Sequence, residues 1–232
     1  MNKPRILFWH RKDLRIDDNR GLIKAFSLSN AITSIYILDN NYSYEFNAKS
    51  RSWFLGNSLK ELSKSWDKLG SRLIIREGNP LILIPQFAQL IDAKYVICNK
   101  LIEPYEISRD LEIKNSLNEL KIEFIDLWDH LLLNPSQIFS GSKTPYTVYG
   151  PFYKKLKLKL TINPINLPKD LRTNSNNISN LKDLDQTIKE NQKINSSEQI
   201  LETFLKKVNF SGANICPCKP GEKAAEQLLE EF

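Results

Sequence analysis

The sequence contains little of what defines several large protein classes. Its 232 residues include three cysteines, two histidines and no long apolar run. Cys98, Cys216 and Cys218 are too few and too unevenly spaced for a disulfide framework, so a reduced, cytoplasmic setting fits best. The apolar runs fall far short of the ~20 residues that a membrane helix needs, and the charged N-terminus shows no signal peptide. We therefore expect a cytoplasmic protein with no membrane partner.

Sharp motifs for catalysis and metal binding are missing as well. The sequence has no GxGxxG after its first apolar run, no GxxxxGK[ST] phosphate loop and no GxSxG nucleophile motif. Two histidines without a CxxC pair argue against a zinc site, and we interpret the CxC at 216–218 as incidental. The residues by themselves predict a ligand-binding domain, with no catalytic or metal-binding residue to assign.

The charge balance is mildly basic, because 33 Lys and Arg against 27 Asp and Glu give a net charge of +6. Between Lys143 and Lys159 stand five lysines and no acid. Such a stripe attracts phosphates, but a solvated face on a lysine-rich protein is the simpler interpretation. We interpret Tyr149 and Tyr153 beside it as packing at a junction of two domains rather than as stacking on single-stranded nucleic acid.

Hydrophobic patterning predicts an α/β fold for the first 130 residues. Five short apolar runs are typical of strands: Arg5–Trp9, Ile32–Leu38, Leu73–Ile75, Tyr95–Cys98 and Ile122–Leu127. Four stretches with helical spacing alternate with them, with Asn19 and Pro104 as start signals and Gly70 as a stop signal. This alternation predicts a Rossmann-like five-stranded parallel sheet with helices on both faces.

The predicted topology also predicts a ligand site. In such sheets ligands bind outside the carboxyl ends of the strands, where the strand order reverses. Arg11 and Lys12 follow the first predicted strand and Asp39 follows the second. Glu103 follows the fourth. With the common order 3-2-1-4-5, the first and fourth strands flank the crevice, so we expect Arg11 and Glu103 to face one pocket.

The segment Phe8–Asn19, FWHRKDLRIDDN, resembles the opening motif of the DNA photolyase/cryptochrome family, in which a strand is followed by R-x-D-L-R and then by D-N at the first helix. We expect its charges to pair within the turn, Arg11 and Arg15 with Asp13 and Asp17. Further similar segments follow in order: Tyr36–Asp39, Arg51–Leu55, Asn99–Asp110, Leu127–Phe152 and Pro220–Phe232. Together they look most like bacterial class I cyclobutane-dimer photolyases of the deazaflavin-antenna type.

The resemblance implies a protein of two parts. In this family an N-terminal α/β domain holds a light-harvesting antenna chromophore, and an all-helical domain holds FAD and acts on a pyrimidine dimer flipped out of DNA. We expect the antenna domain over residues 1–130, a linker over 131–200 and the start of the helical domain over 201–232. On this expectation the chain is a monomer that lacks the FAD domain, contacts DNA only through that missing part and cannot repair DNA alone.

Residues 161–200 are rich in Asn, Ser, Lys and Pro, which is typical of a connector. Ile200 and Phe204 then begin a helical pattern after Ser196, and a second helix is expected from Glu222. With no helical domain to cover it, the apolar side of that second helix, which includes Leu228, should be exposed. A fragment, a truncated gene product and half of a split protein all stay open as explanations.

The antenna pocket is assigned by matching positions to the family. Arg11 and Glu103 flank the crevice, as the strand order predicts. Arg51 begins the second predicted helix, where its guanidinium would reach the polar edge of a chromophore. Ile37 and Leu38 offer strand backbone and an apolar wall to a planar ring. Ion pairing with Asp13 or Glu103 is the alternative role of the two arginines.

Leu101 is the sixth expected pocket residue and departs from the family pattern. Deazaflavin-type relatives usually carry an acidic residue there, and leucine cannot accept a hydrogen bond. The resemblance therefore leaves 8-hydroxy-5-deazaflavin, methenyltetrahydrofolate, another flavin and an empty site open.

Three functions remain in competition. The first is the antenna part of a DNA-repair photolyase, and the second is a cryptochrome-like blue-light photoreceptor. The third is a stand-alone α/β module that binds ATP or AMP at the strand ends. The likeness of Leu127–Phe152 to photolyases favours the first.

Overall fold

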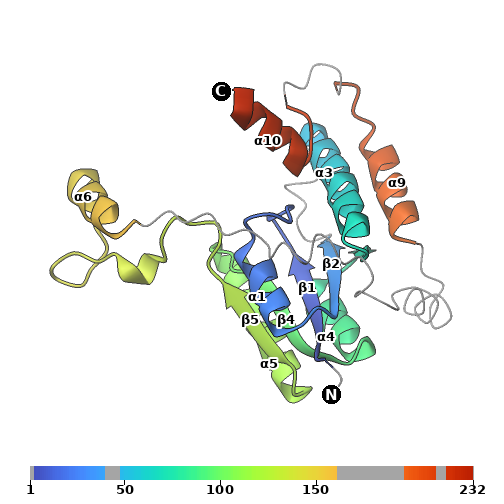
Figure 1. Ribbon diagram of the computed structural model, residues 1–232, viewed down its shortest axis with the longest axis horizontal. Helices are drawn as coiled ribbons and strands as arrows, with labels where there is room; N and C mark the ends of the chain where they lie inside the picture. Colours follow the sequence, from blue (N-terminus) through green and yellow to red (C-terminus); the bar gives the residue numbers. More distant parts are fainter. Residues whose placement is uncertain (1–2, 40–47, 161–195, 213–217, 232) are drawn as a thin grey trace.

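The computed structural model describes residues 3–39, 48–160, 196–212 and 218–231. Its centre is a five-stranded sheet in which every paired strand is parallel, in the order β3-β2-β1-β4-β5 (Figure 1). The strands are β1 Arg5–His10, β2 Ile32–Leu38, β3 Leu73–Glu77, β4 Ala93–Asn99 and β5 Glu123–Leu127. The predicted fold class and strand order are therefore confirmed.

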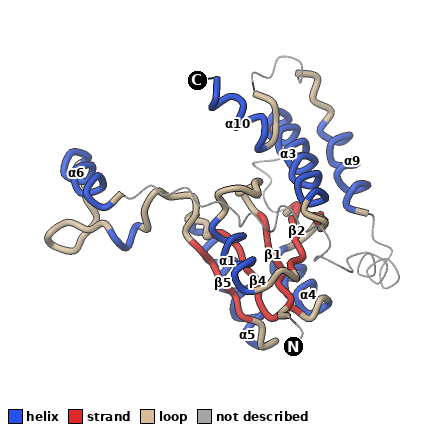
Figure 2. Tube along the Cα trace, viewed as in Figure 1, coloured by secondary structure: helices blue, strands red, loops and turns tan. Residues whose placement is uncertain are grey.

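Helices cover both faces of this sheet. On one face lie α1 (Arg20–Leu28) and α3 (Lys49–Lys68), and on the other lie α4 (Pro80–Leu90) and α5 (Pro104–Glu119) (Figure 2). Because side chains alternate along a strand, Ile6 and Phe8 enter the α1/α3 core, whereas Leu7 and Trp9 enter the α4/α5 core. Both cores are closed by fully buried aliphatic side chains.

The local start and stop signals operate as expected. The Asn19 side chain accepts a hydrogen bond from the Leu22 N–H at 3.0 Å and caps α1. Pro104 is the first residue of α5. Gly70 follows α3 with a φ of 77°, a left-handed conformation that glycine adopts at little cost.

A further helix, α9 (Ser197–Val208), packs against α3 and β3. Its Ile200 and Leu201 are buried in the α1/α3 core. The Ser197 hydroxyl accepts a hydrogen bond from the Ile75 N–H of β3 at 2.9 Å. The helix is thus part of the α/β layers, and the predicted domain boundary at 200/201 falls inside it. Most of the predicted connector, residues 161–195, lies outside the described residues.

The helix α6 (Tyr149–Lys159) projects away from the sheet, beyond the short turn η1 (Pro135–Gln137) (Figure 1). It contains no buried residue. Tyr149 is 71% exposed and stacks on Tyr153, with ring centroids 5.5 Å apart. The described residues do not test the packing predicted for these two tyrosines at a junction of two domains, which stays a prediction.

The last described helix, α10 (Glu222–Glu231), lies beside α3. Its Leu228 and Leu229 are exposed, as predicted. None of the described helices is both long enough and apolar enough to cross a bilayer.

Candidate functional site

The loop after β1 is organised around the buried carboxylate of Asp13. It accepts hydrogen bonds from the Arg11 backbone N–H at 2.9 Å, from Asn19 Nδ2 at 3.1 Å and from Asn99 Nδ2 at 2.6 Å. Asn99 stands at the end of β4, so this network joins the ends of the two central strands. The side-chain pairing that we expected between Asp13 and the neighbouring arginines does not occur.

Arg15 pairs outside the turn. Its guanidinium donates to Asp129 at 2.7 Å, and the same carboxylate accepts the Arg20 N–H at 3.1 Å. The expected partners Asp13 and Asp17 are therefore replaced by a residue that follows β5. The charges of the opening motif tie separate chain segments together, and most of them are not directed at a ligand.

His10, the last residue of β1, is fully buried below this loop. Trp66 Nε1 of α3 donates to His10 Nε2 at 3.0 Å, so Nδ1 carries the proton and donates to the Asp13 carbonyl at 3.1 Å. Burial lowers the pKa of His10 below its ordinary 6.5, although Asp13 opposes the shift. The ring is therefore neutral at pH 7 and fastens α3 to β1.

Arg11 is buried at the carboxyl edge of the sheet. Its guanidinium contacts the Asp110 carboxylate and donates to the Asn99 carbonyl. Arg109 binds the other oxygen of Asp110 at 3.0 Å. Both guanidinium groups lie 4.9 Å from the centroid of the Trp9 ring. Arg11 thus has an ion-pair partner, but it is Asp110 and neither of the expected Asp13 and Glu103.

Lys12 connects the same loop to the first turn of α5. Its ammonium lies 2.6 Å from Glu103 and 3.1 Å from the buried Glu106. Hydrogen bonds with Glu106 and with Lys12 lower the pKa of Glu103 to about 2. Glu103 is half exposed at the rim and directed at Lys12. The two turns that were expected to meet across the crevice do meet, through Lys12 and not through Arg11.

A small cavity of about 50 Å³ opens at this edge. Three of the six expected residues, Arg11, Ile37 and Leu101, line it together. Glu103 does not, since it lies on the rim. Leu38 faces the opposite core because side chains alternate along β2. Arg51 is exposed on α3 and does not reach the cavity.

Other lining residues were not assigned from the sequence. They are Trp9, His10, Lys12, Tyr36, Asp39, Pro80, Glu106 and Arg109. A usable signal was the spacing on α5, where Glu106, Arg109 and Asp110 share a face with the buried Ile113. Charged side chains on the core face of a helix need partners, and here the partners are the residues that follow β1.

The chemistry of this edge suits a flat ring with polar margins. Ile37 and Leu101 supply apolar surface, Trp9 supplies an aromatic one, and Lys12 and Asp39 supply polar groups. The enclosed volume is far below the ~300–1,000 Å³ of pockets that engulf a drug-sized ligand. The cavity at this edge is therefore a shallow opening between the strand ends and the first turn of α5.

The sequence of this chain is similar to those of known proteins. A family model described as DNA photolyase matches residues 6–172. A deoxyribodipyrimidine photo-lyase of Synechococcus sp. is 37% identical over 98% of the chain and 45% of its own length. The chain therefore spans less than half of that relative.

Solved structures agree on the architecture. A bacterial class III photolyase from Agrobacterium tumefaciens superposes with a TM-score of 0.77 over 100% of this chain and 45% of its own, at 23% identity, which shows the fold alone. A cryptochrome of Synechocystis sp. superposes with a TM-score of 0.64 at 29% identity, over 71% of this chain and 36% of its own.

Proposed function

Because the chain belongs to the DNA photolyase family, we propose that it serves as the α/β part of a deoxyribodipyrimidine photolyase, which uses light to repair cyclobutane pyrimidine dimers in DNA. The observation that carries this is the 37% identity to a photo-lyase, which extends over 98% of the chain and is not confined to the nucleotide-type fold. A class I relationship, with a deazaflavin antenna, is the finer form of the proposal and rests on the motif resemblance.

The role proposed for this part is to hold the light-harvesting chromophore at the carboxyl edge of the sheet. Bound there, the chromophore would supply absorption of near-UV or blue light. Ile37 and Leu101 would form its apolar wall and exclude water, and Lys12 would orient its polar edge. Arg11 would hold the wall in place through Asp110. Leu101 offers no hydrogen bond to a chromophore, so the proposal leaves both 8-hydroxy-5-deazaflavin and methenyltetrahydrofolate as candidates.

Chromophore binding is tested by absorbance and fluorescence titration of the purified chain with each of these two compounds. We expect a saturable spectral shift with one of them. Ile37→Trp should abolish the shift because the larger ring fills the slot, whereas Ile82→Trp, at an exposed position on α4, should not. Circular dichroism of both variants checks that they fold. Absence of any shift with the wild-type chain would refute the chromophore role.

Repair itself is proposed to need FAD held by a helical domain. The described residues form an α/β unit with the further helices α6, α9 and α10. We expect no dimer reversal when the 232-residue chain is illuminated with FAD and dimer-containing DNA. Turnover by this chain alone would contradict the division of labour proposed here.

A cryptochrome-like photoreceptor is the second candidate, favoured by the likeness to the Synechocystis sp. cryptochrome. The two candidates differ in chemistry at the flavin. A repair assay of the native FAD-containing protein or complex to which this chain belongs separates them. Light-dependent repair supports the first, and a photoreduced flavin without repair supports the second.

A further inference from the structure

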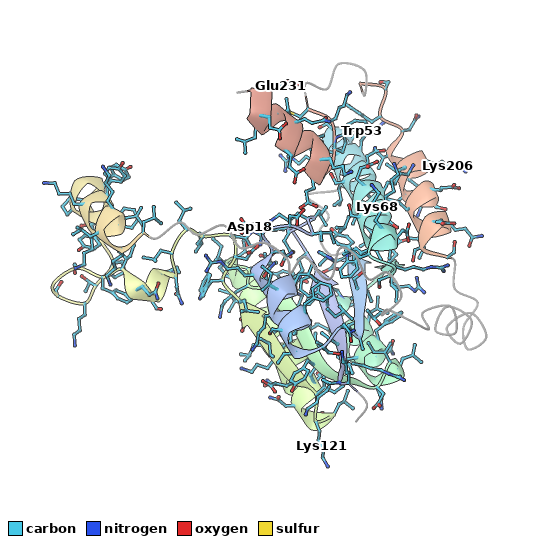
Figure 3. All side chains as sticks on the ribbon, viewed as in Figure 1. Asp18, Trp53, Lys68, Lys121, Lys206 and Glu231 are labelled. Carbon is cyan, nitrogen blue, oxygen red and sulfur yellow. The ribbon has the colours of Figure 1, made fainter. Side chains whose placement is uncertain are left out.

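A cavity of about 530 Å³, distinct from the chromophore slot, lies between α3 and the segment 219–227. Its walls include Trp53 and Lys68 on α3, both labelled in Figure 3, and the first turn of α10. Its volume falls within the ~300–1,000 Å³ typical of small-molecule sites. The proposed chromophore role does not use any of these residues.

The start of α10 is fixed in place over this cavity. The Glu222 carboxylate accepts hydrogen bonds from the Ile16 N–H at 2.9 Å and the Asp17 N–H at 2.8 Å. Gly221 has a φ of +105°, and a Cβ there would lie 2.8 Å from Glu61 Cβ of α3. Only glycine allows this approach, so the α10 wall is seated against α3 in a defined position.

Four lysines line the cavity, and their charges are poorly balanced. Lys64 is paired with Glu61 at 2.6 Å. For Lys68, Lys219 and Lys223, no salt bridge is formed with any residue in the described part of the chain. The Glu222 carboxylate does not neutralise them, because it is directed at the 16–17 backbone and burial raises its pKa.

Two of these lysines come together from different elements. Lys68, the last residue of α3, and Lys223, the second residue of α10, both line the cavity, and the Lys223 ammonium lowers the pKa of Lys68. Like charges held together cost free energy unless an anion lies between them. The first turn of α10 adds N–H groups that have no partner within the helix, and these also favour an anion.

We propose that this cavity binds a phosphate-bearing small molecule, with its phosphate between Lys68 and Lys223. A cavity of about 530 Å³ accommodates a free phosphate compound, and binding of a nucleic acid backbone is an outcome that the test below distinguishes. Trp53, more than three helical turns before Lys68 on α3, offers an aromatic surface at the far end of the cavity.

The test is isothermal titration of the 232-residue chain with pyrophosphate and with ADP, at constant ionic strength set with chloride. We expect single-site binding that weakens about tenfold in Lys68→Gln and in Lys223→Gln, since each removes one charge-assisted contact. Both side chains are exposed, so the fold should be unaffected. Lys206→Gln, an exposed lysine on α9 away from the cavity (Figure 3), is the matched control and should bind as wild type.

Three results would overturn the proposal. One is the absence of binding of both compounds. Another is binding that Lys68→Gln and Lys223→Gln leave unchanged. The third is binding of a single-stranded oligonucleotide, lost steeply with salt, without binding of pyrophosphate or ADP. Since chromophore binding is measured at the other cavity, either proposal can fail without the other.

Discussion

The helices α9 and α6 have nearly the same length, but α9 is packed into the fold and α6 is not. α9 buries Ile200, Leu201 and Val208 against α3 and β3. α6 buries nothing and projects from the unit. Both carry lysines in the last turn. Both therefore place positive charge at the C-terminal end of the helix, where it is favourable.

Three features separate the two helices. The apolar stripe of α9 includes three buried residues, whereas the stripe of α6, which is formed by Tyr149, Phe152, Tyr153 and Leu156, includes none. α9 begins with a capping box formed by Ser196 and Gln199, and α6 has no side-chain cap. α9 also packs against α3 and β3. A helix therefore joins the fold when its apolar side is buried against a neighbouring element and its first turn is capped.

The largest effect is expected from truncating a buried leucine of α9 and comparing it with an exposed leucine of α6. Leu201→Ala should lower the free energy of unfolding by about 2–4 kcal/mol, because Leu201 is 5% exposed and its loss leaves a cavity. Leu158→Ala in α6 should change it by less than about 0.5 kcal/mol, since Leu158 is 83% exposed. Urea denaturation followed by circular dichroism measures both. Equal effects would show that α9 is not part of the cooperative unit.

The contact between α3 and α9 is tested by substituting Gly56 of α3, with Gly150 of α6 as the comparison. A Cβ on Gly56 of α3 would lie 2.6 Å from Leu205 Cδ2 of α9, so Gly56→Ala should cost about 1–3 kcal/mol of stability through overpacking. Gly150 in α6 has no atom within 4 Å of such a Cβ, and Gly150→Ala should raise the helix content slightly. Thermal melts of both variants report the contrast. Stabilisation by Gly56→Ala would mean that α9 does not rest on this position.

The stability of the α/β unit should also depend on pH, through the buried His10 at the end of β1. Burial holds the pKa of His10 below 6.5, so below pH 6.5 the unfolded chain takes up a proton that the folded chain refuses. Stability is therefore lost as pH falls from 6.5 toward the folded pKa, by up to ~1.4 kcal/mol per pH unit.

Urea midpoints at pH 7.5, 6.5 and 5.5 measure the slope. His10→Gln should flatten it, because glutamine does not titrate. The exposed His130, the other histidine, provides the control, and His130→Gln should leave the slope unchanged. A slope that survives in His10→Gln would show that another group causes it.

The smallest expected effect concerns the caps. Ser196→Ala removes the capping box of α9 and should cost about 1 kcal/mol of global stability. Val148→Ser supplies α6 with a cap, and it should raise the helical signal without moving the unfolding midpoint, since α6 contains no buried residue. Circular dichroism during thermal unfolding measures both quantities. A raised midpoint in Val148→Ser would show that α6 packs on the domain.

The fold was predictable because its signals are local. Alternating apolar runs, Asn19, Pro104 and Gly70 act on their own neighbours, and the strand order is the common one for sheets of this class. The candidate site was predictable only in part. Arg11, Ile37 and Leu101 line the cavity, but the alternation of β2 side chains turns Leu38 to the other face. The position of β2 in the sheet was predicted correctly, but the face of the sheet on which Leu38 lies was not.

The order of residues along the chain was sufficient to predict the parallel α/β layers and the family to which the chain belongs. The partners of the charges became known only from the folded chain: Arg11 with Asp110, Arg15 with Asp129 and Glu222 with the 16–17 backbone. The physical reason is range. Helix and strand formation depends on residues a few positions apart, whereas a buried charge must pair with whatever the packing of distant elements brings beside it.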